Sequence, residues 1–401
     1  MLSLSMIVRD EAERLERCLA SVKGFVDEMV LVDTGSQDGT VALARGLGAT
    51  VHEIPWPGDF APARNTAMQW LNGDWVLVLD GDEQLRPEAM APLRALMAQP
   101  DVLLINLLRL EVGARQSPYS SVSRLFRRHP AIRWSRPYHS SVDESVAELQ
   151  RLEPHWRVAD CGVPALLHDG YRPELLAEGS KAQRLRQAME QELEQRPNDA
   201  YACAKLGSLE VSEGNLAQGI ALLRRGLEHC PPQAHPERYE LLLHLGIATA
   251  EADPGGGASL YRQALALPLP QRLSLGARLN LAALLLEQGD LVEALALCRT
   301  ATVVAPEVGL GWYNLGLVSR RSGDLVGALE AYGQARRLNP DHAETHQNLA
   351  VAELLAGDIA ASRASFRQAI ALLSRQGRAG EAAHLRQQAG AMVQLEPEAR
   401  A

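Results

Sequence analysis

Residues Val76–Leu85 read VLVLDGDEQL, and this stretch decides how the N-terminal half of the chain folds. Its apolar residues predict a buried strand that ends near Leu79. Three carboxylates, Asp80, Asp82 and Glu83, follow around one glycine. We expect them outside the packed core, because ionised carboxylates are rarely fully buried. They are then either solvated turn residues or ligands of something positively charged.

On both sides of this stretch, short apolar runs alternate with amphipathic segments. We expect strands at residues 2–8, 28–32, 50–54, 75–79 and 102–110, and helices at residues 10–23, 39–46, 63–71 and 87–97. Strands that alternate with helices of this length predict a largely parallel sheet covered on both faces. In such a sheet ligands bind at the carboxyl ends of the strands, beside a switch in strand order.

From about residue 199 the sequence follows a different period. A Leu-Gly or Leu-Ala pair recurs, and successive pairs lie 39, 36, 34 and 34 residues apart. The pairs begin at Leu206, Leu245, Leu281, Leu315 and Leu349. The last two spacings equal the tetratricopeptide period, and the later units also carry its small residues and its helix-ending prolines. Residues 199–372 therefore resemble tetratricopeptide (TPR) repeats, followed by a capping helix over residues 379–393.

These patterns divide the 401-residue chain into three regions. We expect an α/β domain over residues 1–175, a charged helical connector over residues 176–198 and an all-α repeat domain over residues 199–395. A repeat solenoid offers a concave groove for a peptide or protein, or it only supports the domain before it. Repeat architecture does not name a ligand, so both readings stay open.

Composition narrows the class of protein. The formal net charge of −9 argues against a nucleic-acid partner, because phosphate contacts need a basic face. The five cysteines form no CxxC pair, which favours a reducing compartment over a disulfide framework or a zinc site. No apolar run approaches the roughly 18 residues of a membrane span. We expect a cytoplasmic protein without a transmembrane segment.

Several chemistries place acidic residues after a strand, and spacing separates them. An EF-hand calcium loop needs Glu six residues after its glycine, but Arg45 stands there after Gly39. An aspartyl phosphotransferase motif would end in Thr or Val where this chain has Gln84. A dinucleotide-binding glycine fingerprint is absent from the sequence. A divalent cation held by Asp80 and Asp82 together with a diphosphate remains, although a DxD motif can also be a solvated strand end.

Four sequence segments, which occur in a fixed order before residue 84, distinguish a metal–diphosphate site from a solvated strand end. They read LSMIVRDEAERLERCLASV, VDEMVLVDTGSQDGT, DFAPARNTA and GDWVLVLDGDE. Together they closely resemble the family 2 glycosyltransferases, in particular bacterial members with a C-terminal TPR array. The resemblance covers roughly the first 175 residues. It implies an α/β GT-A fold followed by an all-α TPR solenoid. The implied reaction transfers a sugar from a nucleotide-diphosphate sugar, with UDP-sugar favoured, using Mn²⁺ or Mg²⁺ and inverting the anomeric carbon.

The resemblance also assigns roles to single residues. It places the nucleotide sugar against Val8, Arg9, Glu11, Asp33, Arg64 and Asp80. Asp33 would accept a hydrogen bond from the base or ribose, and the planar guanidinium of Arg64 would meet the base or diphosphate. The metal would be held by Asp80 and Asp82. His168, in ALLHDGY, would be a further metal ligand or a phosphate contact.

Ordinary structural roles compete with these assignments. Asp38, before Gly-Thr, and Asp59, before Phe, each suit a turn or the N-cap of a helix. Arg9 and Glu11 could pair with each other on a solvated helix start. His168 follows an apolar run, where a histidine is often structural.

The sequence motifs for the acceptor half of the site are less clear than those for the donor half. Inversion needs a base that takes the proton of the acceptor. Relatives carry a His-Glu pair where this chain reads IRWSRPYHSSVDESV, and here His139 is followed by Ser140. We therefore take Asp143, Glu144 and His139 as the catalytic candidates, with Asp143 preferred. Two aromatic residues of this stretch could stack on a sugar or pack in the core: Trp134 and Tyr138.

The prediction is a metal-dependent inverting glycosyltransferase, of the hexosyltransferase type, with a C-terminal TPR domain. Its acceptor is unknown, and one candidate is a peptide or protein held by the repeats. The alternative is a non-catalytic TPR scaffold with a degenerate glycosyltransferase domain. Ser140 favours this alternative, whereas the intact Asp33, Arg64, Asp80 and Asp82 favour the enzyme.

Overall fold

The computed structural model describes residues 1–113, 118–136, 140–169 and 180–395. Tyr138 and His139 lie outside these residues. The chain separates into two compact units, Met1–Cys230 and Pro231–Ala401, and each is described by itself. None of the described helices is both long enough and apolar enough to cross a lipid bilayer.

The N-terminal unit is built on an eight-stranded sheet with the order β3-β2-β1-β4-β7-β6-β8-β5. The strands are β1 (Leu2–Val8), β2 (Glu28–Asp33), β3 (Thr50–Glu53), β4 (Trp75–Val78), β5 (Glu83–Leu85), β6 (Val102–Glu111), β7 (Tyr119–Arg127) and β8 (Arg157–His168). The prediction of a largely parallel sheet holds for the block β3-β2-β1-β4 and for the pair β6–β8. Strand β7 runs antiparallel to β4 and β6, and β5 runs antiparallel to β8.

Helices cover both faces of the sheet, as predicted. The helices of this part are α1 (Ala12–Val22), α2 (Thr40–Gly46), α3 (Phe60–Ala67) with the 3₁₀ turn η1 (Met68–Trp70), α4 (Pro87–Met97) and α5 (Asp143–Leu152). Apolar side chains of α1, α2 and α4 share one core cluster with the sheet. Those of α3 and α5 share a second cluster with Val76, Val78 and Phe126. The carboxyl ends of β1, β2 and β4 therefore lie between two packed layers.

Among the described residues, the N-terminal unit also contains α7 (Ser180–Gln195), α8 (Ala200–Ser212) and α9 (Leu216–His229). They share an apolar cluster around Met189 and Leu206. The first predicted repeat, α8 with α9, thus belongs to the same compact unit as the sheet. Asp199 caps α8 by accepting a bond from the backbone N–H of Ala202, and it also binds the Arg136 guanidinium with both oxygens at 3.2 Å.

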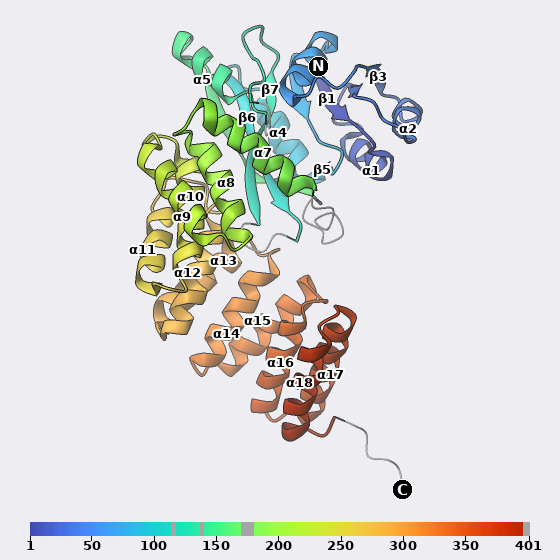
Figure 1. Cartoon of the computed structure of the whole chain (residues 1–401). Helices are drawn as coiled ribbons and strands as arrows, with labels where there is room; N and C mark the ends of the chain where they lie inside the picture. Colours follow the sequence, from blue (N-terminus) through green and yellow to red (C-terminus); the bar gives the residue numbers. More distant parts are fainter. Residues whose placement is uncertain (114–117, 137–139, 170–179, 396–401) are drawn as a thin grey trace. The chain divides into compact units, whose positions relative to one another are not determined.

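The C-terminal unit consists of helices in pairs, as predicted (Figure 1). They are α10 (His235–Thr249), α11 (Pro254–Leu265), α12 (Leu275–Gln288), α13 (Leu291–Val304), α14 (Gly309–Arg321), α15 (Leu325–Leu338), α16 (Ala343–Leu355), α17 (Ile359–Arg375) and α18 (Ala379–Met392). The predicted capping helix corresponds to α18. Glycine permits close approach within pairs, because a Cβ at Gly316 would lie 2.5 Å from the ring of Tyr332.

Candidate active site

The site forms where the parallel strands of the N-terminal unit end. Strand pairing sets Val8, the last residue of β1, beside Asp33, the last residue of β2. Strand β4 pairs with the other side of β1 and ends two residues before Asp80. The carboxyl ends of these three strands therefore bring together residues that lie far apart in the sequence, as expected for a ligand site in such a sheet.

The turn after β2 is ordered by its own carboxylates. Asp33 is buried, and its Oδ2 accepts the backbone N–H groups of Gly35 and Ser36 at 2.9 and 3.0 Å. Asp38 accepts bonds from the N–H of Thr40 and from that of Ala12, so it ties this turn to the start of α1. The turn role expected for Asp38 is thus present. The N-cap position of α2 itself is Gly39.

Asp80 meets two guanidinium groups. Its Oδ1 lies 2.8 Å from Nη2 of Arg64 on α3, and its Oδ2 lies 2.6 Å from Nη2 of Arg124 on β7. Burial opposes ionisation of Asp80, but the two arginines hold its pKa well below the usual range. The side chain is still 37% exposed. A solvent-accessible carboxylate therefore stands between two cations at the end of β4.

Arg124 has no counterpart in our sequence-based prediction. In the β6–β7 register, Ile105 pairs with Leu125 and Asn106 pairs with Ser123, which leaves Arg124 as the extra residue of a β-bulge. A bulge redirects a side chain out of the regular alternation of a strand. Here it aims Arg124 at Asp80. No local sequence pattern marks this bulge, because it depends on which strand pairs with which.

Arg64 is placed by the aromatic stretch that follows β7. Its guanidinium carbon lies 4.8 Å from the centroid of the Trp134 ring. Asn65 holds that segment in place by exchanging two hydrogen bonds of 2.9 Å with the backbone of Trp134. Trp134 is only 4% exposed and packs edge-on against Phe126. It therefore supports Arg64 from the core.

Asp82 faces a buried histidine. Its Oδ2 lies 3.3 Å from Nε2 of His168, whose Nδ1 lies 2.5 Å from Oε2 of Glu111. Burial alone would lower the pKa of His168, but the two carboxylates raise it to about 9. The last residues of β6 and β8 thus meet the acidic turn.

Glu83 contradicts the expectation that all three carboxylates lie outside the core. It is fully buried as the first residue of β5, which pairs with β8. Its Oε1 lies 2.7 Å from Nη1 of Arg109, and its Oε2 accepts the N–H of Asp80 at 2.9 Å. An arginine and a backbone donor therefore compensate its burial. The short strand was missed because its partner lies more than eighty residues away in the sequence.

Glu11 is brought to the acidic turn as well. A Cβ at Gly81 would lie 2.8 Å from Cδ of Glu11, so the glycine admits this side chain. Arg14 pairs with Glu11 at 2.9 Å and lies 3.9 Å from Asp82. Burial raises the pKa of Glu11 to about 7. Arg9 has a half-exposed side chain 3.7 Å from Asp10, so the Arg9–Glu11 pair that we considered is replaced by Arg14–Glu11.

The catalytic candidates separate in the structure. His139 lies outside the described residues. Glu144 pairs with Arg136 at 3.4 Å and with Arg196 at 3.1 Å. Asp143 is exposed at the start of α5, and its Oδ1 accepts the hydroxyl of Ser123 at 2.5 Å. Asp59, for comparison, is the N-cap of α3, as we expected.

The residues around Asp82 suit a divalent metal that arrives with a phosphate ligand. Among the described residues no three His, Cys, Asp or Glu side chains are grouped as a metal site. Asp82 and His168 nevertheless present one oxygen and one nitrogen donor 3.3 Å apart. Mg²⁺ commonly binds through one or two carboxylates and takes its other ligands from phosphate and water. The donor set therefore fits, whereas both oxygens of Asp80 are engaged by arginines.

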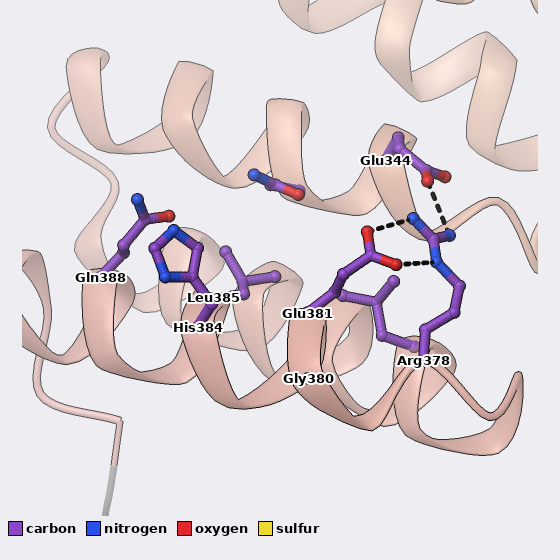
Figure 2. Close-up of a pocket in the computed structure, with 9 residues that line it drawn as sticks. Glu344, Arg378, Gly380, Glu381, His384, Leu385 and Gln388 are labelled. Carbon is purple, nitrogen blue, oxygen red and sulfur yellow. Dashed lines mark hydrogen bonds and ion pairs between the residues drawn. The ribbon is translucent and has the colours of Figure 1, made fainter.

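The C-terminal unit contains a pocket of about 290 Å³ between α16 and α18 (Figure 2). It is lined by Glu344, Gln347, Leu373, Arg378, Gly380, Glu381, His384, Leu385 and Gln388. Among the lining residues, Arg378 pairs with Glu344 at 2.7 Å and with Glu381 at 2.6 Å. The charges of these three side chains are paired with each other. A ligand that bound here would have to replace these ion pairs with contacts to its own polar groups.

Known proteins resemble both parts of the chain. Residues 3–155 match the family model for glycosyl transferase family 2, and residues 250–308 and 309–342 match tetratricopeptide repeat models. The TPR repeat-containing protein Synpcc7942_0270 of Synechococcus elongatus is 45% identical over 308 residues, which are 76% of this chain and 75% of that protein. Among solved structures, YrrB, described as a TPR protein with an unusual peptide-binding site, shares 16% identity with a TM-score of 0.39. The match covers 50% of this chain and 99% of YrrB.

Several relatives carry glycosyltransferase names, among them one from Rickettsia bellii and one from Bacillus subtilis. An uncharacterized glycosyltransferase of Rickettsia bellii is 31% identical over 154 residues, which are 36% of this chain and 52% of that protein. The SPbeta prophage-derived glycosyltransferase SunS of Bacillus subtilis is 23% identical over 176 residues, or 43% of this chain and 40% of SunS. The chain thus spans about half the length of these two relatives or less. It belongs to glycosyl transferase family 2, as a glycosyltransferase that carries tetratricopeptide repeats in its C-terminal half.

Proposed function

We propose that this glycosyltransferase uses a nucleotide-diphosphate sugar, with a UDP-sugar as the favoured donor, and inverts the anomeric carbon. The observation that carries the proposal is the meeting of Arg64, Arg124 and Asp80 beside the Asp82–His168 pair. Cations next to a two-donor metal site suit a diphosphate, which gains negative charge as its bond to the sugar breaks. Asp82 and His168 would hold Mn²⁺ or Mg²⁺, which would supply Lewis-acid stabilisation of the leaving diphosphate.

The proposed role of each side chain follows from its position in the site. Arg64 and Arg124 orient and neutralise phosphate oxygens through their planar guanidinium groups. Asp80 keeps both arginines at the end of β4 until the donor enters. Val8, Arg9 and Asp33 border the place proposed for the nucleoside, at the ends of β1 and β2.

The base is assigned to Asp143. Its carboxylate is exposed, whereas that of Glu144 is engaged by two arginines. Asp143 also accepts the hydroxyl of Ser123, the residue next to Arg124, so it stands near the bulge that shapes the donor site. An exposed carboxylate at this place can take the proton of an acceptor hydroxyl.

The acceptor proposed for the repeats is a peptide or protein. The support is the repeat architecture, which presents side chains along successive helices, and the pocket between α16 and α18. Removal of the ion pairs among the residues that line that pocket by Arg378→Ala should then alter acceptor use while donor binding stays unchanged.

Calorimetric titration of UDP tests the donor assignment. We expect binding in the presence of Mn²⁺, loss of most of it with EDTA, and the same loss in Asp82→Ala. Asp101→Ala is the matched control, because Asp101 forms an exposed ion pair with Arg157 on another part of the unit. Wild-type protein that binds none of UDP, GDP, CDP or dTDP in any condition would contradict the proposal. Positive binding would be followed by a screen of UDP-sugars for hydrolysis.

A further inference from the structure

We propose that Glu111 is a positioning residue that fixes His168 with its Nε2 toward the cation site at Asp82. We further propose that a buried chain of charges connects this pair to the turn that carries Asp80. The inference rests on the proposed function, because it assumes that Asp82 and His168 hold the metal.

The first step is the orientation of the histidine ring. Glu111 and His168 are paired residues on the adjacent strands β6 and β8, so the sheet itself fixes their separation. The Glu111 side chain is only 4% exposed, and its Oε2 lies 2.5 Å from Nδ1 of His168. A carboxylate can only accept, so Nδ1 carries the proton of this bond. The other ring nitrogen, Nε2, faces Asp82 at 3.3 Å and releases its own proton when it binds a metal.

The second step concerns the other oxygen of Glu111. Its Oε1 lies 2.9 Å from Nε of Arg109 and also accepts the hydroxyl of Ser120. Both oxygens of Glu111 are thus held, and its carboxylate plane cannot turn away from His168 without breaking a charge-assisted bond. The orientation of the ring is therefore imposed by three strands: β6, β7 and β8.

The third step closes the chain on the acidic turn. Arg109 reaches Oε1 of Glu83 at 2.7 Å, and Oε2 of Glu83 accepts the N–H of Asp80 at 2.9 Å. The sequence of contacts from Asp80 through Glu83, Arg109, Glu111 and His168 returns to Asp82. The backbone of the turn and its outermost donor atoms are therefore held by one buried network.

Stability alone does not account for this network. Buried ion pairs can often be replaced by apolar side chains of similar volume without loss of stability. What an apolar replacement cannot supply is a fixed orientation of the His168 ring that keeps Nε2 toward Asp82. Histidine ligands in metal sites commonly donate their second N–H to a carboxylate for this purpose.

The test measures the metal directly in the full-length protein, with Mn²⁺ and UDP as the probes. Pulsed electron paramagnetic resonance of the Mn²⁺·UDP complex should show coupling to an imidazole nitrogen, and His168→Ala should abolish it. Glu111→Gln should lower the affinity for Mn²⁺ roughly ten- to a hundredfold. The matched control is Glu210→Gln, since Glu210 is another fully buried carboxylate paired with an arginine, Arg186, away from the site.

The outcomes separate this inference from the proposed function. If Mn²⁺ and UDP bind but no nitrogen coupling is seen, or if Glu111→Gln binds Mn²⁺ like wild type, the role of Glu111 is refuted and the donor assignment stands. If the protein binds neither Mn²⁺ nor any of UDP, GDP, CDP and dTDP, both proposals fall. Should Glu111→Gln not fold, Ser120→Ala removes the hydroxyl that donates to Glu111 and accepts from Arg109, and it should weaken Mn²⁺ binding by about two- to tenfold. Unchanged affinity in that variant would also refute the inference.

Discussion

Asp199→Asn tests whether the first repeat helix is part of the catalytic unit. Asp199 is 13% exposed and holds Arg136, whose φ of 70° is in the left-handed region that non-glycine residues rarely adopt. At a charge separation of about 4 Å and an effective dielectric constant of about 20, the attraction is about 4 kcal/mol. The variant no longer has to bury the charge of Asp199, and this gain offsets part of the lost attraction. We therefore expect the free energy of unfolding to fall by about 2 kcal/mol. Asn caps helices about as well as Asp, so α8 keeps its N-cap.

The assay is calorimetric unfolding of the full-length protein. A loss of about 2 kcal/mol in a unit of this size should lower the Tm of the N-terminal unit by roughly 4–8 °C. Asp324→Asn is the matched control, because Asp324 caps α15 through the N–H of Gly327 and no arginine among the described residues pairs with it. Equal small shifts in the two variants would refute the reasoning, since the Arg136 clamp would then contribute nothing measurable.

Four further measurements address other features. Arg124→Ala should weaken UDP binding in the presence of Mn²⁺ at least tenfold if the bulge aims this side chain at the diphosphate, and unchanged binding would contradict that role. Gly316→Ala should destabilise the C-terminal unit by about 1–3 kcal/mol in urea unfolding, because the new Cβ would lie 2.5 Å from the Tyr332 ring; a neutral effect would mean that the ring can move aside. In metal-free protein, the pKa of His168 is raised to about 9 in the folded state. The stabilisation of the fold by protonated His168 is therefore fully present below the pKa of the unfolded chain, near 6.5, and is lost as pH rises through 9. The pH dependence of unfolding should flatten in His168→Gln over that range. Burial raises the pKa of the Cys298 thiol to about 12, so it should resist alkylation at pH 8 until the protein is unfolded.

Local patterns predicted the elements of this fold well. Helix α4 has the predicted bounds, and the strands at Leu2–Val8 and Thr50–Glu53 differ from prediction by at most one residue. These segments have an apolar face with a clear period, which needs no knowledge of the neighbours. The helix pairs of the C-terminal unit follow from the 34-residue repeat for the same reason.

Long-range pairing explains what could not be predicted. Glu83 looked like a solvated residue because its partner, Arg109, lies 26 residues away and faces it only once β5 joins the sheet. Arg124 depends on a bulge between two strands, and the antiparallel direction of β7 has no local signal. The sequence thus predicted site roles for Asp80, Asp82, Arg64 and His168, but it did not predict the contacts of Arg124 with Asp80 and of Arg109 with Glu83.

Asp199 determines where the transferase part of this chain can be separated from its repeats. The same carboxylate begins the first helix of the repeat series and neutralises an arginine of the α/β domain. A gene fragment that ends before Asp199 would lack the first repeat and would leave Arg136 without this counterion. It would also expose the apolar side chains of α7 that pack against α8 and α9. A fragment that ends after Cys230 keeps both sets of contacts. Shuffling of repeats to alter the acceptor is therefore best begun at Pro231, so that the first helix pair stays with the transferase.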